Sequence, residues 1–249
     1  EIVDSLVGSE MCIRDSYLCE KNLDPNIPLR TPVGKSGRRA NGSDVFGIDS
    51  VNEFDVFLDD IYDYCETLDI GVDTLVHESG PSQIEINLNH GDPLKLADQT
   101  FMFKRAVRQV ALKHGIHATF MAKPHQGQPG SSMHIHQNLI STSSGANIFS
   151  DADGKESDEF YQYIGGLQTY LPDAMVFFAP YVNSYRRFVI DASAPINTHW
   201  GFENRTVGLR VPLSSPESKR VENRIPGADT NPYFCLLYTS DAADEVDRG

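Results

Sequence analysis

Several short stretches of the chain alternate hydrophobic and polar residues, which is the pattern of a β-strand with one buried face. In residues 83–89, Ile84, Ile86 and Leu88 alternate with polar residues. Residues 73–90 therefore predict two strands joined by a turn at "SGPS". The stretches "IHATFMAKP", "SSMHIHQNLI" and "NRTVGLRVP" predict further strands.

Elsewhere, hydrophobic residues recur at every third or fourth position, as in a helix packed against a core. One helix is predicted from Ser50 to Leu68, with Ser50 and Glu53 as a capping box. A second helix is predicted from an N-cap at Asp92 to a stop at Gly115.

A third helix is predicted from Asp158 to Leu171, before the helix-breaking residues Pro172 and Pro180. Residues 21–47 are rich in Gly, Pro, Asn and Ser and predict a long loop. The order of these elements predicts an α+β fold, with antiparallel strands and with helices covering one face of the sheet.

The composition narrows the class of protein. The 249 residues carry a formal net charge of −14, which argues against nonspecific nucleic-acid binding because Lys and Arg are needed to neutralise phosphates. The longest apolar run, at 174–180, is too short to span a bilayer, and the first residues do not resemble a signal peptide. The four cysteines show neither CxxC pairing nor zinc-site spacing. We therefore expect a cytoplasmic protein that binds neither nucleic acid nor membranes.

Polar residues on the predicted strand faces supply candidate chemistry. His134 and His136 are two residues apart in "PGSSMHIHQ", so both rings lie on one face of a strand. Glu78 and Glu85 flank the "SGPS" turn, which brings their carboxylates near each other, and a divalent cation between them would relieve the repulsion. A solvated polar strand face is the alternative explanation of both patterns.

A third acid, Glu222, lies between Arg220 and Arg224 in "SKRVENRIP", and alternation places all three on one face. Carboxylates with at most one imidazole favour Mg²⁺ or Mn²⁺ over zinc. Seven of the 21 Lys and Arg residues lie between positions 186 and 224, which predicts a ligand that carries phosphate or carboxylate. Internal Arg–Glu pairs are the alternative. Arginines beside a carboxylate-held metal indicate phosphoryl transfer.

Several long motifs, in a fixed order, resemble the catalytic domain of the glutamine synthetase family. They are "HESGPSQIEINLNHGDPL", "KPHQGQPGSSMHIHQ", "NSYRRF", "NRTVGLRVP" and "RVENRIPGADTNPY", between about Tyr17 and Tyr233. The resemblance implies a curved antiparallel sheet with helices on one face. It also implies an ATP-dependent ligase that phosphorylates the side-chain carboxylate of glutamate and lets an amine displace phosphate from the γ-glutamyl phosphate. Mg²⁺ or Mn²⁺ would hold the phosphates.

The resemblance also assigns roles to residues of these motifs. The metal ligands that it implies are Glu78, Glu85, His134 and Glu222. The nucleotide-binding residues that it implies are Asp73, Asn89, His136, Asn138, Arg205, Arg210 and Arg220. For glutamate it implies Gly130, Arg187 and Arg224, and as catalytic arginines it implies Arg187, Arg205 and Arg210.

Two departures from the family pattern concern the amine. Ser193 occupies the place of a glutamate that ammonium-using members carry, and Pro129 replaces an asparagine. Both changes resemble the γ-glutamylpolyamine synthetase branch, so we expect a polyamine-like amine as acceptor, although the acidic Asp191 lies nearby. An ammonium-using glutamine synthetase and a noncatalytic relative are the alternatives.

Both ends also depart from the family. Residues 17–234 are predicted to be a partial catalytic domain, and residues 1–16 and 235–249 are predicted to be non-native flanks. Where the family has a strand with two metal-binding glutamates, the chain has "MCIRDS", with Asp15 as the nearest acid. Family members form stacked rings with shared active sites. We therefore expect a ring-shaped homo-oligomer such as a dodecamer for the intact protein, and no activity from the partial domain alone.

Overall fold

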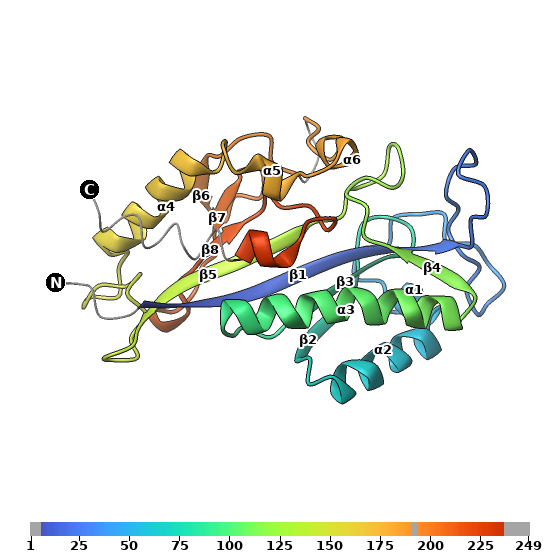
Figure 1. Ribbon diagram of the computed structural model, residues 1–249, viewed down its shortest axis with the longest axis horizontal. Coiled ribbons are helices and arrows are strands. Elements are labelled where there is room, and N and C mark those ends of the chain that lie inside the picture. Colours follow the sequence, from blue (N-terminus) through green and yellow to red (C-terminus); the bar gives the residue numbers. More distant parts are fainter. Residues whose placement is uncertain (1–5, 191–193, 237–249) are drawn as a thin grey trace.

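The computed structural model describes residues 6–190 and 194–236, with side chains from Asp15 onward. In this part of the chain, eight strands form one sheet in the order β2-β3-β1-β5-β8-β7-β6, and β4 pairs with β1. The long strand β1 runs through the middle of the molecule (Figure 1). The strands are β1 (Leu6–Glu20), β2 (Val72–His77), β3 (Gln83–Leu88), β4 (Ile116–Thr119), β5 (Met133–Ser141), β6 (Trp200–Phe202), β7 (Leu209–Val211) and β8 (Val221–Asn223).

Helices cover the sheet and connect its strands. The α-helices of the described residues are α1 (Ile48–Asn52), α2 (Asp55–Thr67), α3 (Pro93–Lys113), α4 (Asp158–Tyr170), α5 (Met175–Phe178) and α6 (Val182–Tyr185). A short 3₁₀ turn, Pro216–Ser218, precedes β8. The long helix α3 packs against β1 and β4, and α2 packs against α3 (Figure 1).

One hydrophobic core joins the apolar face of the sheet to the helices. Alternate strand residues enter it, such as Ile84 and Ile86 of β3 and Met133 and Ile135 of β5. The buried stripes of α2, α3 and α4 supply Phe57, Leu58, Ile61, Leu96, Phe103, Val107, Val110, Phe160, Ile164 and Leu167. Because successive strand side chains point to opposite faces, burial of the apolar set turns the polar residues between them to the other face.

Most of the predicted elements are confirmed. The hairpin is present as β2 and β3, and the α+β arrangement with one covered face is found. The helix that was expected after Asp92 is α3, and the Asp92 carboxylate accepts a hydrogen bond from the backbone N–H of Lys95 at 2.9 Å. Gly115, just beyond its end, has a φ of 76°, a left-handed conformation that suits glycine.

The prediction of one helix over residues 50–68 is wrong. The chain leaves the helix between α1 and α2, where the loop before α1 bonds to Glu53: the Glu53 carboxylate accepts from the backbone N–H of Ser36 at 3.1 Å. Ser50 lies inside α1, and its hydroxyl donates to Asp44 at 2.5 Å instead of capping a helix. A tertiary contact has therefore replaced the predicted capping box.

The sequence predicted antiparallel strands, but one pair of strands is parallel. β6 and β7 run parallel over three residue pairs, from Trp200 and Leu209 to Phe202 and Val211. Glu203 follows β6 with a φ of 50°, and its N–H bonds to the Val211 carbonyl at 3.0 Å. This turn lets a short connection join two parallel strands.

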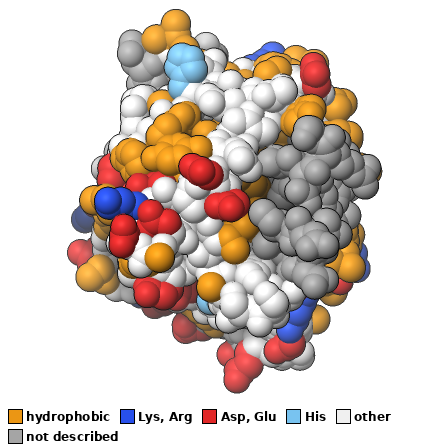
Figure 2. All heavy atoms as spheres, turned by 90° about the vertical axis from the view of Figure 1, so that its left-hand side faces the viewer, with side chains coloured by type: hydrophobic (Ala, Val, Ile, Leu, Met, Phe, Trp, Pro, Cys, Tyr) orange, Lys and Arg blue, Asp and Glu red, His pale blue; other side chains and the backbone are white. Residues whose placement is uncertain are grey.

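Acidic side chains are prominent on the face shown in Figure 2, in keeping with the net charge of −14. No helix within residues 6–190 or 194–236 is long and apolar enough to cross a membrane.

Candidate active site

The polar face of the sheet brings predicted site residues from three neighbouring strands into register. The Cα positions of His136 in β5, Glu222 in β8 and Arg210 in β7 are paired across the sheet. Their neighbours along the strands, such as Ile135 and Val221, enter the hydrophobic core on the other face. Strand alternation therefore fixes the direction of these polar side chains.

Glu222 is the centre of this group and is almost completely buried, with 1% exposure. Its Oε1 accepts a hydrogen bond from Arg224 Nη1 at 2.6 Å, and its Oε2 accepts from Arg210 Nη1 at 2.7 Å. His134 Nδ1 lies 3.3 Å from Oε1. Burial alone would raise the pKa of Glu222, but nearby positive charge, from the histidines when they are protonated and from the guanidinium groups, lowers that pKa to about 2. The carboxylate is therefore ionised at neutral pH.

The two histidines are neutral in this environment. Burial and the Arg224 charge hold the pKa of His134 well below its usual range, and burial lowers the pKa of His136 to about 4. Arg220 Nε donates to His136 Nδ1 at 3.0 Å, so the ring proton of His136 resides on Nε2. Neutral imidazoles keep a lone pair, which is the form that binds metals.

A second group, called here the acidic group, consists of Asp15, Glu78 and Glu85. Asp15 in β1 is paired with Glu85 in β3, and Glu78 follows β2. Burial, the Asp15 charge and the Glu78 charge raise the pKa of Glu85 to about 9, and a hydrogen bond to Glu78 acts in the same direction. Burial and the Glu78 charge raise the pKa of Asp15 to about 6. The acidic group therefore carries more negative charge than its surroundings compensate.

Arg187 and Gly130 lie beside the acidic group. Arg187 is 2% exposed and donates hydrogen bonds to the backbone carbonyls of Ile225 and Arg224. Its guanidinium group also interacts electrostatically with the Asp15 carboxylate. Burial lowers its pKa to about 10, although Asp15 opposes this. A Cβ at Gly130 would lie 2.5 Å from Arg187 Cγ, so the arginine chain occupies the space that a larger residue would need.

Three of the residues predicted to bind the nucleotide lie further along the strands than the acidic group does: His136, Asn138 and Asn89. Along β5, His134, His136 and Asn138 are successive residues of the polar face. The strand register aligns His134 with Asn87, because both pair with position 13 of β1. β3 and β5 run in the same direction, because both are antiparallel to β1. Asn89, two residues beyond Asn87, therefore lies about level with His136.

Two predicted residues are not brought to the groups described above. Asp73 is exposed on β2, and its charge raises the pKa of Tyr62 in α2, which places it toward the helices. Arg205 is exposed in the loop between β6 and β7, where its charge helps to lower the pKa of Glu203. Ser193 and Asp191, which the amine prediction invoked, lie outside the described residues.

The predicted metal ligands form two groups. Glu78 and Glu85 belong to the acidic group, whereas His134 lies against Glu222. Among the residues that the structure describes, no three His, Cys, Asp or Glu side chains lie close enough together to hold one metal ion.

Some residues of the site had no role in the sequence-based assignment. Ser132 donates to Asp15 Oδ2 from both its N–H and its hydroxyl, each at 2.7 Å. Glu203 contacts Arg210 at 3.2 Å. The alternation that selected His134 and His136 also selects Ser132, so its position was available from the sequence. Glu203 belongs to a turn, and no pattern marked it.

Comparison with known proteins gives a consistent picture. The family described as glutamine synthetase, catalytic domain, matches residues 9–242. Gamma-glutamylputrescine synthetase PuuA of Escherichia coli is 40% identical over 222 residues, which cover 88% of this chain and 47% of that protein. Glutamate–isopropylamine ligase of a Pseudomonas species is 36% identical over 213 residues, which cover 82% of this chain and 44% of that protein.

Glutamine synthetase of Pyrococcus abyssi is 38% identical over 177 residues, which cover 71% of this chain and 40% of that protein. The solved structure of apo GmaS without ligand superimposes with a TM-score of 0.79 and 25% identity, covering 99% of this chain and 55% of that one. The chain thus spans about half the length of the curated relatives that it matches.

Proposed function

The chain belongs to the glutamine synthetase family, and we propose that it supplies the catalytic face of an ATP-dependent ligase that joins glutamate to an amine. The observation that carries this proposal is the polar sheet face, which gathers four acids, two neutral imidazoles and the buried arginines Arg187 and Arg224. Such a face suits phosphoryl transfer, because clamping and charge neutralisation supply most of its catalysis.

The residues present fit a divalent cation, Mg²⁺ or Mn²⁺. Asp15 Oδ1 is buried without a hydrogen-bond partner, and the acidic group is short of positive charge. The 3.3 Å between His134 Nδ1 and Glu222 Oε1 is also close to the roughly 3 Å that separates adjacent ligands of an octahedral ion. Cations held by Glu78 and Glu85, and by His134 and Glu222, would neutralise the phosphate oxygens of ATP.

Glu222 would have to change partners to hold a cation, because both of its oxygens bond to arginines here. The acidic group has no such arginine competitor, but its three carboxylates would have to move closer together to hold one cation, because the described residues contain no such cluster. Asp15 is included in this proposed site because it shares the burial and the mutual repulsion of Glu85.

The arginines of this face would bind the anionic reactants. Nε of Arg187 and Nε of Arg210 are buried and have no hydrogen-bond partner. Unpartnered buried donors of this kind are satisfied when an oxyanion binds. Arg187 and Arg224, beside Gly130, would hold glutamate, while Arg210 and the more distant Arg205 would hold the transferred phosphoryl group.

The nucleotide would lie along the strands, with its phosphates toward Glu85 and His134. Its base would then lie toward Asn89 and Asn138, past His136, which Arg220 orients. Asp73 lies toward the helices and is not included in this arrangement. The proposed order of these contacts rests on the strand register.

The reaction has two steps. An oxygen of the glutamate γ-carboxylate attacks the terminal phosphorus of ATP, which breaks the bond to ADP and forms γ-glutamyl phosphate. The amine nitrogen then attacks the acyl carbon, phosphate leaves with the electron pair of the C–O bond, and the nitrogen loses one proton. The products are a γ-glutamyl amide, ADP and phosphate.

The proposed acceptor is an alkylamine of the polyamine class. Two relatives that share 36–40% identity are named for putrescine and isopropylamine as acceptors. Phosphate release that needs ATP and glutamate, and that saturates with putrescine at lower concentrations than with ammonium, is the expected result for the intact protein. The reverse order would favour an ammonium-using glutamine synthetase instead.

Binding of ATP and Mn²⁺ to this chain separates a catalytic face from a noncatalytic relative. We expect calorimetric titration to show ATP binding only with Mn²⁺ present. The absence of a binding signal for both ATP and Mn²⁺ would support the noncatalytic alternative. The intact protein is expected to complete its site by forming a homo-oligomer.

A further inference from the structure

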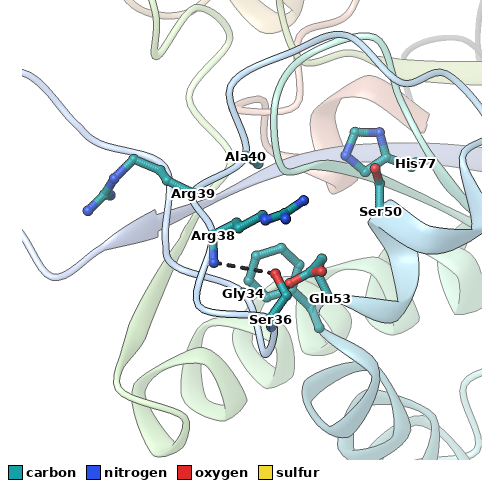
Figure 3. Close-up of a pocket in the computed structure, with 9 residues that line it drawn as sticks. Gly34, Ser36, Arg38, Arg39, Ala40, Ser50, Glu53 and His77 are labelled. Carbon is teal, nitrogen blue, oxygen red and sulfur yellow. Dashed lines mark hydrogen bonds between the residues drawn. The ribbon is translucent and has the colours of Figure 1, made fainter.

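A cavity of about 170 Å³ lies outside the candidate active site. It is lined by Gly34, Ser36, Arg38, Arg39, Ala40, Ser50, Glu53, Phe54 and His77 (Figure 3). These residues come from the loop before α1, from α1 and the turn after it, and from the end of β2. The proposed function uses none of them.

The cavity lies on the opposite side of the sheet from the acidic group. Along β2, Val76 is paired with Glu85, whereas His77 is paired with Ile84. Ile84 belongs to the hydrophobic core, so His77 faces the helix side while Glu85 faces the polar side. A ligand in this cavity would therefore be separate from the reactants of the proposed ligase.

Two nitrogen-bearing groups in the cavity, the buried Nδ1 of His77 and the exposed guanidinium of Arg38, have no hydrogen-bond partner among the described residues. His77 is 2% exposed, and its Nδ1 is buried without a hydrogen bond. The Arg38 side chain crosses the cavity in Figure 3, whereas that of Arg39 extends away toward its partner Glu20. The described residues place no carboxylate in an ion pair with Arg38. With its proton on Nδ1, the buried His77 would recover from a ligand oxygen the free energy that an unpartnered donor costs, whereas the exposed Arg38 would contribute its charge.

The cavity wall also contains one fixed acceptor, the carboxylate of Glu53. Its Oε2 accepts from the Ser36 N–H at 3.1 Å, and a Cβ at Gly34 would lie 2.1 Å from this oxygen. The loop is thus folded directly onto Glu53. A ligand must therefore offer acceptors to Arg38 and His77 and a donor to Glu53.

The geometry points to a site for hydrogen phosphate in this cavity, as the free ion. Hydrogen phosphate has oxygens for Arg38 and His77 and retains an O–H at neutral pH for Glu53. Sulfate has the same size and shape but carries no proton, so its contact with Glu53 would be repulsive. A space of about 170 Å³ suits an ion of this size with a few waters.

The test is calorimetric titration of the whole chain with phosphate and with sulfate at matched ionic strength. We expect phosphate to bind about tenfold or more tightly than sulfate, and Arg38→Gln to weaken phosphate binding by about tenfold or more. Lys35→Gln is the matched control. It removes a charge from the same loop, but Lys35 bonds to Asp55 and does not line the cavity.

A third variant tests the role of the acceptor. Glu53→Gln keeps a carbonyl oxygen for Ser36 but removes the negative charge, so the preference for phosphate over sulfate should fall to about twofold or less. Phosphate held by the arginines of the polar face would be insensitive to Arg38→Gln. The proposal is therefore overturned if phosphate does not bind, if sulfate binds equally well, or if Arg38→Gln behaves like Lys35→Gln. Methyl phosphate is mostly a dianion without an O–H at neutral pH, so it should bind no more tightly than sulfate, and binding as tight as that of phosphate would show that no O–H is donated to Glu53.

Discussion

Asp15 and Glu85 are paired across β1 and β3, and this places the buried carboxyl group of Asp15 beside the partly buried carboxyl group of Glu85, with Glu78 next to both. Ionising both carboxyl groups costs free energy, as the raised pKa values of Asp15 and Glu85 show. A protein gains nothing in stability from such an arrangement at neutral pH. It becomes reasonable if a divalent cation binds there, because the cation removes the repulsion.

The pH dependence of stability without metal should reveal this cost. Glu85 has a pKa of about 9 in the folded protein and an ordinary value when unfolded, so the unfolded state loses its proton first as the pH rises. The stabilisation is present in acid and is lost as the pH rises toward 9. With EDTA present, we expect the free energy of unfolding to fall by up to ~3 kcal/mol between pH 6.5 and 9.

Urea denaturation of Glu85→Gln provides the comparison for this pH range. The variant has no proton to lose at position 85, so its stability should change much less with pH. Glu66→Gln, on the exposed surface of α2, should retain the full slope of the parent chain. If the free energy of unfolding changed equally with pH in all three proteins, the pKa of Glu85 would not be raised in the folded state.

Removal of the Glu222 carboxylate should be strongly destabilising. Arg210 and Arg224 both bond to it, and the substitution Glu222→Gln would leave their charges without their shared partner. Breaking a buried pair in this way costs about 3–5 kcal/mol. Glu203→Gln removes an exposed partner of the same Arg210 and should change the unfolding midpoint little. Equal effects of the two substitutions would mean that burial of Glu222 does not matter.

A methyl group at position 130 should disturb the proposed glutamate site. In Gly130→Ala the new Cβ would lie 2.5 Å from Arg187 Cγ and 2.7 Å from the Ala122 carbonyl oxygen, so Arg187 must move. We expect a loss of about 1–3 kcal/mol in stability by chemical denaturation. Gly42→Ala adds the same methyl group where no atom lies within 4 Å and should be nearly neutral. An unchanged stability of Gly130→Ala would show that Arg187 is not held against this glycine.

Much of the site was predictable because it lies on regular strands. Alternation placed Glu85, His134 and Glu222 on polar faces, and the core residues between them confirm those faces. The two groups that these residues form depend on the strand order, in which β1 lies between β3 and β5. No local pattern contains that order, so the division of these residues into two groups could not be read from the sequence.

The residues that sequence reasoning misplaced are governed by long-range contacts. Ser50 and Glu53 have the spacing of a capping box, but each bonds to the preceding loop instead. Asp15 was named only as the acid nearest to the family's metal-binding strand, and β1, which extends from Leu6 to Glu20, places it in the acidic group. The assignment of residues 1–16 and 235–249 to non-native flanks stays a prediction.

The central claim is that the polar sheet face binds a divalent cation through the acidic group, and a titration with Mn²⁺ at pH 7 tests it most directly. Because Glu85 retains its proton at this pH, binding should release about one proton, which calorimetry in buffers of different ionisation enthalpy would detect. Glu85→Gln should abolish the proton release and weaken binding, whereas Glu66→Gln should change neither. Absence of Mn²⁺ binding, or proton release that persists in Glu85→Gln, would contradict the proposed site.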